Sequence, residues 1–204
     1  MKLYYAPGTC ALAVHVALIW AGDDYQVEQV VLGSDAYKKI NPMGAVPALV
    51  DGDSGVMLQA DSLLKYISNK YPDAAMGGPE GLLGEQQIDQ WLAFLGGDLH
   101  PAFWPIFRPA RITTREDQES IDAVQTAANN RLHSVFGILD QHLAGRDYIV
   151  GEQRSIVDVY AYVMTRWMAR TRLILADFPD LLRHFERTGN DAGVIQAENE
   201  QGLR

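Results

Sequence analysis

The sequence predicts an α/β domain over residues 1–75, a linker over residues 76–84 and an all-helical domain over residues 85–204. Short strand and helix patterns alternate in the first part, whereas only helical periodicity follows the linker. Residues 72–84 contain two prolines and four glycines, a composition typical of a connection between domains. A chain of 204 residues has room for two small domains.

The first domain begins with a strand and a buried helix. Lys2 to Tyr5 is a short strand pattern that the breaker pair Pro7-Gly8 closes. Residues 11–21 are apolar almost all round, which predicts a helix buried on most sides, and Gly22 stands where a helix stop belongs. Residues 25–32 alternate and are rich in valine, which predicts a second strand.

The rest of the first domain predicts a short turn, a hairpin and a helix. Residues 35–40 favour at most one helical turn. Residues 46–50 and 56–58 are strand patterns on either side of a turn at 51–55 that is rich in Gly, Asp and Ser. Residues 60–70 carry apolar side chains at helical spacing. The predicted order of elements is therefore βαβαββα.

The second domain has helical patterns throughout. Prolines at 101 and 105 should bend or interrupt a long segment over residues 85–107. Further helices are predicted over residues 114–143, 155–170, 179–188 and 192–200. The 155–170 helix begins with Ser155-Ile156-Val157-Asp158, an S-x-x-D capping box whose role is in folding.

Composition narrows the class of protein. No apolar run reaches the length of about 18 residues that a membrane span needs, and no signal-peptide pattern is present, so we expect a cytoplasmic protein. The formal net charge of -9 disfavours nucleic acid and anionic membranes as partners. The single cysteine, Cys10, cannot form an intramolecular disulfide, which fits a reducing compartment.

Cys10 lies between the first strand and the first helix. Thr9 or Cys10 is then the helix N-cap, where free N–H groups and the helix dipole favour a thiolate. Such a sulfur can attack a substrate or hold a second sulfur in a mixed disulfide. The alternative is a small buried apolar residue without chemistry.

Val46-Pro47 places a proline inside a strand pattern. A cis peptide bond here would free the N–H and C=O of Val46 to pair with an extended peptide ligand. An edge-strand proline in the commoner trans form is the alternative.

Gln59-Ala60-Asp61 opens the helix predicted over residues 60–70. A helix N-terminus binds carboxylates readily, and Gln59 can donate to a bound oxygen. For Asp61 the pattern favours a structural role as an N-cap or first-turn charge.

His100 lies among apolar residues before two prolines. By itself this pattern favours a core histidine over a catalytic one. With one cysteine and scattered histidines, no zinc site is expected.

Several segments together resemble the cytosolic glutathione S-transferase family, and among its members most closely the bacterial beta class. They are residues 1–12, residues 41–49 around Pro47, Gln59-Ala60, the capping box from Ser155 to Tyr160, and Gln201-Gly202-Leu203. The resemblance covers essentially the whole chain. It implies a thioredoxin-like N-terminal domain that binds glutathione as co-substrate, a helical domain with the second-substrate site, no metal, and a homodimer.

The resemblance also implies a catalytic group. Cys10 would face the sulfur of glutathione, either donating a hydrogen bond to its thiolate or forming a mixed disulfide. His100 matches a beta-class histidine near that sulfur. Tyr5 matches the family's strand-end tyrosine and would support or pack the site, and Thr9 would lie beside the bound glutathione.

The glutathione-binding residues follow from the same resemblance. Val46, before a cis Pro47, would pair its backbone with the cysteinyl part of glutathione. Gln59 and Ala60 would bind the γ-glutamyl carboxylate. Lys38 or Lys39 would replace a loop lysine of relatives, because the segment from Gly33 to Lys39 is shorter here.

The sequence departs from the beta class at several of these positions. Pro101 follows His100 where relatives have lysine, and Ala93 stands two residues after Trp91 where they have asparagine. Gln59-Ala60 replaces a Glu-Gly or Glu-Ser pair. The expected site therefore carries less positive charge for the anionic glutathione than the sites of relatives.

The resemblance implies a glutathione-dependent transferase. The thiolate of glutathione would attack a hydrophobic electrophile or a disulfide held over Phe103, Trp104 and Phe107. Two alternatives stay open at this point: a non-catalytic ligand-binding or interaction module of the same fold, and a regulatory protein whose helical domain binds another protein.

Overall fold

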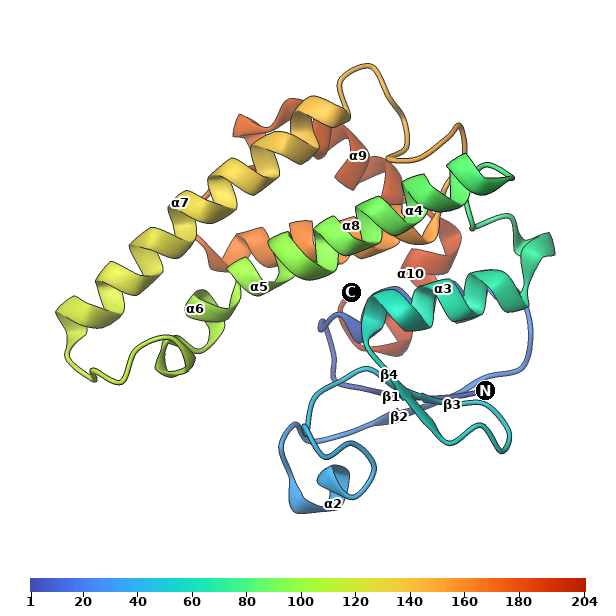
Figure 1. Cartoon of the computed structure of the whole chain (residues 1–204), viewed down its shortest axis with the longest axis horizontal. Coiled ribbons are helices and arrows are strands. Elements are labelled where there is room, and N and C mark those ends of the chain that lie inside the picture. Colours follow the sequence, from blue (N-terminus) through green and yellow to red (C-terminus); the bar gives the residue numbers. More distant parts are fainter.

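The computed structural model describes residues 1–204, and its N-terminal part is a four-stranded sheet in the order β2-β1-β3-β4 (Figure 1). β1 pairs in parallel with β2 and antiparallel with β3, which pairs antiparallel with β4. The strands are β1 (Lys2–Tyr5), β2 (Gln26–Gln29), β3 (Ala48–Val50) and β4 (Val56–Leu58). The helices of this part are α1 (Ala11–Ala21), α2 (Asp35–Lys38) and α3 (Ala60–Lys70). The predicted βαβαββα order is confirmed.

Strand length is where the prediction differs from the structure. The predicted strand over 25–32 is only four residues long as β2, because its register with β1 runs from Lys2–Gln26 to Tyr5–Gln29 and then the partner ends. The strand predicted over 46–50 begins at Ala48, immediately after Pro47, which has no N–H for a ladder. The end of its pairing partner therefore sets the length of β2, and Pro47 sets the start of β3.

Helix α1 is the element that the two parts of the molecule share. It packs against α3 and β1 of the N-terminal part and against α8 and α10 of the helical part. This position explains why its sequence has no polar face, since His15 and its apolar neighbours are all buried. In β1 the side chains alternate, with Leu3 and Tyr5 buried in the core and Tyr4 on the other face, 6.3 Å from the Tyr37 ring.

The remaining chain is helical, with one long helix, α7, forming the outer edge of the molecule (Figure 1). The α-helices are α4 (Leu82–Phe94), α5 (His100–Ala102), α6 (Trp104–Phe107), α7 (Gln118–His142), α8 (Ile156–Trp167), α9 (Pro179–Gly189) and α10 (Ala192–Glu200). Short 3₁₀ turns occupy residues 72–74, 109–111, 168–170 and 175–177. No helix combines the length and apolar character needed to cross a membrane.

The predicted interruption of the 85–107 segment is confirmed. After α4 the helix widens into a π-helical turn over Leu95–Leu99, and short helices follow with Pro101 and Pro105 in their first turns. Pro101 has no N–H for the carbonyl four residues earlier, which is a physical reason for the wider turn before it. α4 itself begins at Leu82, inside the predicted linker.

Helix α8 passes through the middle of the helical part, and the predicted capping box holds its start. The N–H and the hydroxyl of Ser155 both donate to Oδ2 of Asp158 at 2.7 Å. Oδ1 of Asp158 accepts from the Ile149 N–H and contacts Nε2 of His184, each at 2.8 Å. Asp158 is buried. This network anchors α8, which in turn packs against α1, the helix that begins after Cys10.

Candidate active site

Cys10 is the N-cap of α1 and is buried at the end of the loop that follows β1. Its thiol donates to the carbonyl of Val46 at a sulfur–oxygen distance of 3.3 Å. The hydroxyl of Thr9 donates to the Ala6 carbonyl at 2.7 Å, which closes the preceding turn. The thiol is thereby aimed at the segment before β3.

The Val46–Pro47 peptide bond is cis, as the resemblance implied. Pro47 is buried, whereas Val46 is half-buried and its N–H donates to no group of the chain. The Tyr37 hydroxyl and the Asn41 amide both donate to the Ala45 carbonyl, at 2.8 and 2.6 Å. Two hydrogen bonds to the Ala45 carbonyl thus fix the backbone beside Cys10, and the Val46 N–H remains free to donate.

Gln59 precedes α3 with a left-handed backbone, φ 72°, which is unusual for a residue other than glycine. Its side chain is exposed, and Ala60 behind it is buried. The Leu63 N–H donates to the Gln59 carbonyl, so the N–H groups of the first helical turn precede the intrahelical ladder and are free to bind an anion.

His100 lies in the helical part, between Tyr160 and Trp167 of α8. Its Nδ1 is in hydrogen-bond contact with the Tyr160 hydroxyl at 3.1 Å, and its ring centroid lies 5.0 Å from that of Trp167. The Trp167 indole N–H donates to the Gly8 carbonyl at 2.8 Å, two residues before Cys10. Trp167 therefore ties His100 to the loop that carries the cysteine.

Sequence reasoning did not single out Tyr160 and Trp167. Both lie on α8, seven residues apart, and therefore on one face of the helix. The spacing of seven residues could have predicted from the sequence that both side chains share a face. The sequence does not indicate that this face meets His100.

Burial dominates the ionisation of the site. Removal from water raises the pKa of the Cys10 thiol to about 12, although the N–H groups of Cys10 and Ala11 favour the thiolate. Burial lowers the pKa of His100 to about 4, against the opposing effect of the Asp61 carboxylate. The thiolate expected at the helix N-terminus is therefore not the resting form, and both groups are neutral near pH 7.

Two predicted residues lie apart from this group. The Tyr5 ring packs 6.2 Å from the His15 ring, between the sheet and α1, which fits the packing role expected for it. Lys39 caps the end of α2, is exposed and pairs with no carboxylate. Of the predicted residues, the hydrogen bonds and packing contacts connect Cys10, Val46 and Pro47 directly and bring in His100 through Trp167.

An aromatic surface extends from His100 along α6. The rings of Phe103 and Phe107 are stacked with centroids 5.5 Å apart, and each meets the Trp167 ring edge-on at 5.4 Å. Phe103 is buried, whereas Trp104 and Phe107 are 38% and 37% exposed. This surface can receive an apolar group close to His100.

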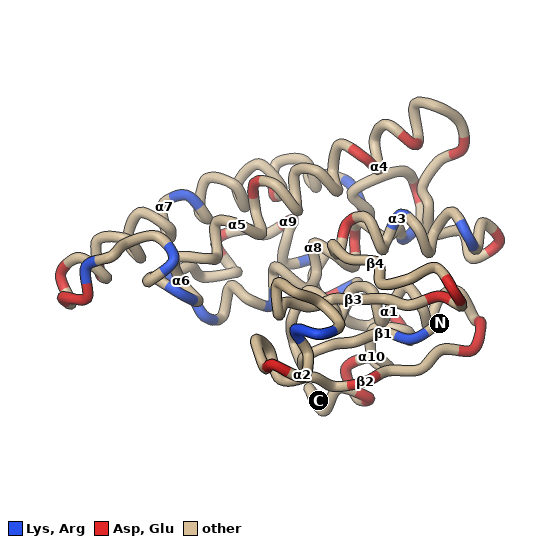
Figure 2. Tube along the Cα trace, turned by 60° about the horizontal axis from the view of Figure 1, so that its bottom comes forward, with Lys and Arg blue, Asp and Glu red and all other residues tan.

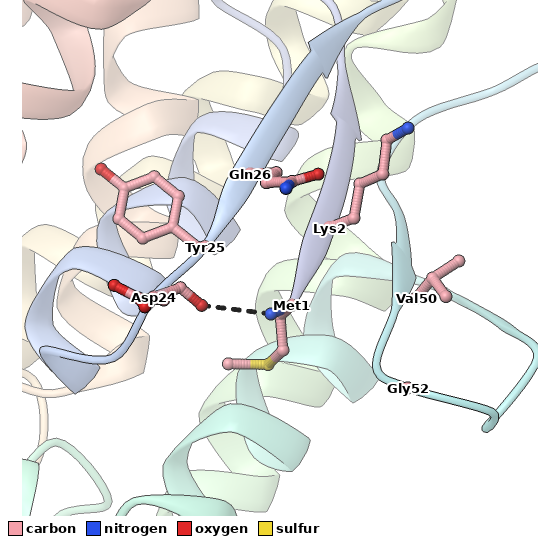
Figure 3. Close-up of a pocket in the computed structure, with 7 residues that line it drawn as sticks. All are labelled: Met1, Lys2, Asp24, Tyr25, Gln26, Val50 and Gly52. Carbon is pink, nitrogen blue, oxygen red and sulfur yellow. Dashed lines mark hydrogen bonds between the residues drawn. The ribbon is translucent and has the colours of Figure 1, made fainter.

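A cavity of about 490 Å³ lies elsewhere, at the opposite end of β1 from Cys10 (Figure 3). It is lined by Met1, Lys2, Asp24, Tyr25, Gln26, Val50 and Gly52. The N-terminal ammonium group donates to the Asp24 carbonyl there, at 3.1 Å. None of the predicted site residues lines this cavity. No group of three or more His, Cys, Asp or Glu side chains is arranged to hold a metal ion.

The fold and this site define a thiol-handling enzyme built on a thioredoxin-like domain. Residues 3–79 match the family model of the glutathione S-transferase N-terminal domain, and residues 99–190 match that of the C-terminal domain. A glutathione S-transferase of Xanthomonas campestris is 32% identical over 206 residues, covering 100% of both chains. The chain therefore belongs to the glutathione S-transferase family.

Solved structures agree with this assignment. A bacterial beta-class glutathione S-transferase of Sphingomonas chungbukensis is 30% identical with a TM-score of 0.89, and both chains are covered completely. A sphingomonad glutathione S-transferase complexed with glutathione is 31% identical with a TM-score of 0.88, again over 100% of both chains. The predicted family, fold and enzyme class are confirmed: the protein is a glutathione S-transferase, with glutathione as its co-substrate.

Proposed function

We propose that the protein conjugates the thiolate of glutathione to hydrophobic electrophiles, and that Cys10 also takes part in thiol–disulfide exchange. The observation that carries the proposal is the Cys10 thiol, bonded to the Val46 carbonyl 3.3 Å away at the N-terminus of α1. Residues 1–75 would bind glutathione, residues 76–84 link the domains, and residues 85–204 hold the second substrate. A cytoplasmic location is part of the proposal and is supported by the single free cysteine.

Glutathione would lie extended beside the cis peptide. The free N–H of half-buried Val46 would donate to the cysteinyl carbonyl, as in the addition of a strand to a sheet edge. The γ-glutamyl carboxylate would accept from the exposed Gln59 amide and from the first-turn N–H groups of α3, beside Ala60. Lys39, which pairs with no carboxylate, would contribute a positive charge at the edge of the site.

Neutral Cys10 and His100 would then act as donors to the sulfur of glutathione. In this arrangement the Tyr160 hydroxyl would donate to Nδ1 of His100, which would leave the ring proton on Nε2 for the ligand. The Cys10 S–H would exchange its bond to Val46 for one to the glutathione sulfur. Two donors and the α1 dipole would favour the thiolate, which is the nucleophilic form.

Both reactions begin with the attack of a thiolate. In conjugation the glutathione thiolate forms a carbon–sulfur bond and the leaving group departs with the electron pair, while the thiol proton passes to solvent. In exchange, the Cys10 thiol loses its proton to solvent, and the resulting thiolate attacks the glutathione sulfur of a glutathionylated substrate and expels the substrate thiolate, which takes up a proton from solvent. A second glutathione thiolate then attacks the mixed disulfide, which frees Cys10 and yields glutathione disulfide.

We propose a homodimer as the functional form. It is supported by large apolar side chains exposed at the start of α4, since Leu82 and Leu83 are 81% and 79% exposed. Light scattering on the purified protein at micromolar concentration should then give twice the chain mass of 22.6 kDa. A mass of one chain throughout that range would rule out a stable dimer.

Calorimetric titration with reduced glutathione tests the binding site. We expect saturable binding, weakened about tenfold in the Gln59→Ala variant because a charge-assisted hydrogen bond to the γ-glutamyl carboxylate is lost. Gln87→Ala is the matched control, because Gln87 is an exposed glutamine on α4, outside the proposed site. No heat of binding at millimolar glutathione would reject the proposal, and equal weakening in both variants would reject the role of Gln59.

A further inference from the structure

The turn before Cys10 is held at Gly8 by two distant parts of the chain. The Gly8 carbonyl accepts from the Trp167 indole N–H of α8 at 2.8 Å, and the Gly8 N–H donates to Oε1 of Gln201 at 3.2 Å. Gln201 directly follows α10, which packs beside α1 although it is the last helix of the chain (Figure 2). Leu203 also lies over this turn, with Cδ2 3.5 Å from the position that a Cβ on Gly8 would occupy. Both backbone polar groups of Gly8 are thus bonded to the helical part.

The Gln201 side chain connects this turn to a buried histidine of α1. Because Oε1 of Gln201 accepts from Gly8, the amide NH₂ group faces His15 and donates to its Nδ1 at 3.2 Å. Nδ1 is therefore unprotonated, and the ring proton of neutral His15 is on Nε2, where it donates to Oε2 of Glu200 at 2.8 Å. Every donor in this chain of hydrogen bonds faces an acceptor.

His15 is completely buried at the centre of the network. The titratable groups that face it are the Glu200 carboxylate of α10, the Tyr25 ring at 5.4 Å and the Tyr5 ring of β1 at 6.2 Å. The Tyr25 hydroxyl also donates to Glu200, at 3.0 Å. Burial lowers the pKa of His15 below its ordinary value of 6.5, against the attraction of the Glu200 carboxylate, so His15 is neutral near pH 7.

A proton on Nδ1 of His15 is incompatible with this arrangement. It would place an N–H group opposite the NH₂ group of Gln201. Turning the amide over would relieve that contact, but it would direct the NH₂ group at the Gly8 N–H instead. Either way two donors face each other, so a charged His15 separates Gln201 from one of its partners. The bond that holds Gly8 therefore depends on both side chains.

We propose that Gln201, oriented by His15, is a positioning residue: it holds the turn at Gly8 and thereby places the Cys10 thiol against the sulfur of glutathione. The inference rests on the proposed function and goes beyond it, because it gives a role in the reaction to a residue outside both substrate-binding surfaces. Variants of Gln201 should accordingly change the rate of the reaction rather than the affinity for glutathione.

The first test is Gln201→Leu, which removes both hydrogen bonds of the amide and keeps a side chain of similar volume. We expect kcat for conjugation and the rate of mixed-disulfide formation to fall about tenfold, because a group displaced from the reacting atoms costs rate. KM for glutathione should change less than about twofold, because the groups proposed to bind it, at Val46 and Gln59, lie on other segments.

Tyr162→Phe is the matched control for lost stability. The Tyr162 hydroxyl donates to Glu198 at 2.8 Å, so this variant also removes a buried hydrogen bond to α10. Tyr162 makes no hydrogen bond to the turn at Gly8, and we expect kcat to stay unchanged although the melting temperature falls as in Gln201→Leu. An equal fall of kcat in both variants would show that Gln201 acts through stability alone, and would overturn the proposal.

The pH dependence tests the part played by His15. Asparagine carries an oxygen as many bonds from Cβ as Nδ1 is, so His15→Asn keeps an acceptor for Gln201 but cannot be charged. We expect His15→Asn to retain most of the wild-type kcat near pH 7.5 and His15→Leu to resemble Gln201→Leu. Between about pH 7 and pH 5 the ratio of the wild-type kcat to that of His15→Asn should fall by up to about tenfold, because only the wild type gains a proton here. A constant ratio would overturn the role of His15, since the ionisation of glutathione is common to both proteins.

Alkylation of Cys10 by iodoacetamide keeps this inference separate from the function on which it rests, because it needs no glutathione. Release of the turn should expose the buried thiol, so Gln201→Leu should react about fivefold faster than Tyr162→Phe. Equal alkylation rates would overturn the inference even if the wild-type protein conjugates glutathione. Failure of the wild-type protein to conjugate or to exchange disulfides would overturn the proposed function, and the alkylation rates would still decide whether Gln201 positions Cys10.

Discussion

The Cys10→Ala variant should lose all mixed-disulfide formation with glutathione while keeping part of its conjugating activity. No other sulfur nucleophile is available, because Cys10 is the only cysteine of the chain. Conjugation should fall only about threefold to tenfold, because the neutral thiol acts there as a weak S–H donor and His100 remains. Mass spectrometry after treatment with glutathione disulfide measures the first effect, and kcat/KM for a neutral electrophile measures the second.

Cys10→Ser is the control for this experiment. A serine hydroxyl keeps a donor at the same place, so conjugation should recover while mixed-disulfide formation stays absent. Unchanged disulfide exchange in Cys10→Ala would show that the assigned role of the cysteine is wrong.

The pH profile of the wild-type protein reports the state of the same thiol. Because burial raises the pKa of Cys10 to about 12, its thiolate fraction in the ligand-free protein should rise about tenfold for each pH unit between pH 7 and 10. The rate of Cys10 alkylation by iodoacetamide should follow this slope without a plateau. A plateau below pH 9 would mean that the helix N-terminus outweighs burial.

Replacement of Asp158 by alanine should give the largest loss of stability in the chain. It leaves the N–H and hydroxyl of Ser155, the Ile149 N–H and His184 without their carboxylate partner in a dry interior. Unpaired buried polar groups each cost about 1–3 kcal/mol, so we expect the free energy of unfolding to fall by about 3–5 kcal/mol. Urea denaturation followed by circular dichroism measures the change.

Asp117 provides a matched aspartate at the surface. It caps α7 by accepting from the Ser120 N–H at 2.9 Å and is exposed, so Asp117→Ala should lower the free energy of unfolding by only about 1 kcal/mol. Asp158→Asn keeps the shape of the side chain and part of its hydrogen bonding. It replaces Asp158→Ala in the comparison if that variant does not fold, and its loss of unfolding free energy should be larger than that of Asp117→Ala and smaller than the loss of about 3–5 kcal/mol expected for Asp158→Ala, at about 2–3 kcal/mol. Equal losses at Asp117 and Asp158 would contradict the importance of the buried network.

Local patterns predicted the helices better than the strands. The bounds of α1, α3 and α10 agree with their sequence patterns, because helix bonds are local and the stop signals stand in the sequence. The start of α7 differs, since Asp117 rather than an earlier residue caps it. The length of β2 depends on β1, its partner in the sheet, which is distant in the sequence. The start of β3 depends on Pro47, which cannot donate to the ladder of hydrogen bonds.

The features of the candidate site also divide into those that local sequence predicts and those that depend on distant residues. The sequence by itself determined the family, the position of Cys10 at a helix start, the proline after Val46 and the capping box of α8. Each of these depends on residues that are close together in the sequence. Only the tertiary structure decided that Trp167 joins His100 to the Cys10 loop and that Arg170 covers Phe107. It also decided that Cys10 is protonated, because its pKa depends on how much water the packed helices remove, and burial is a property of the whole fold.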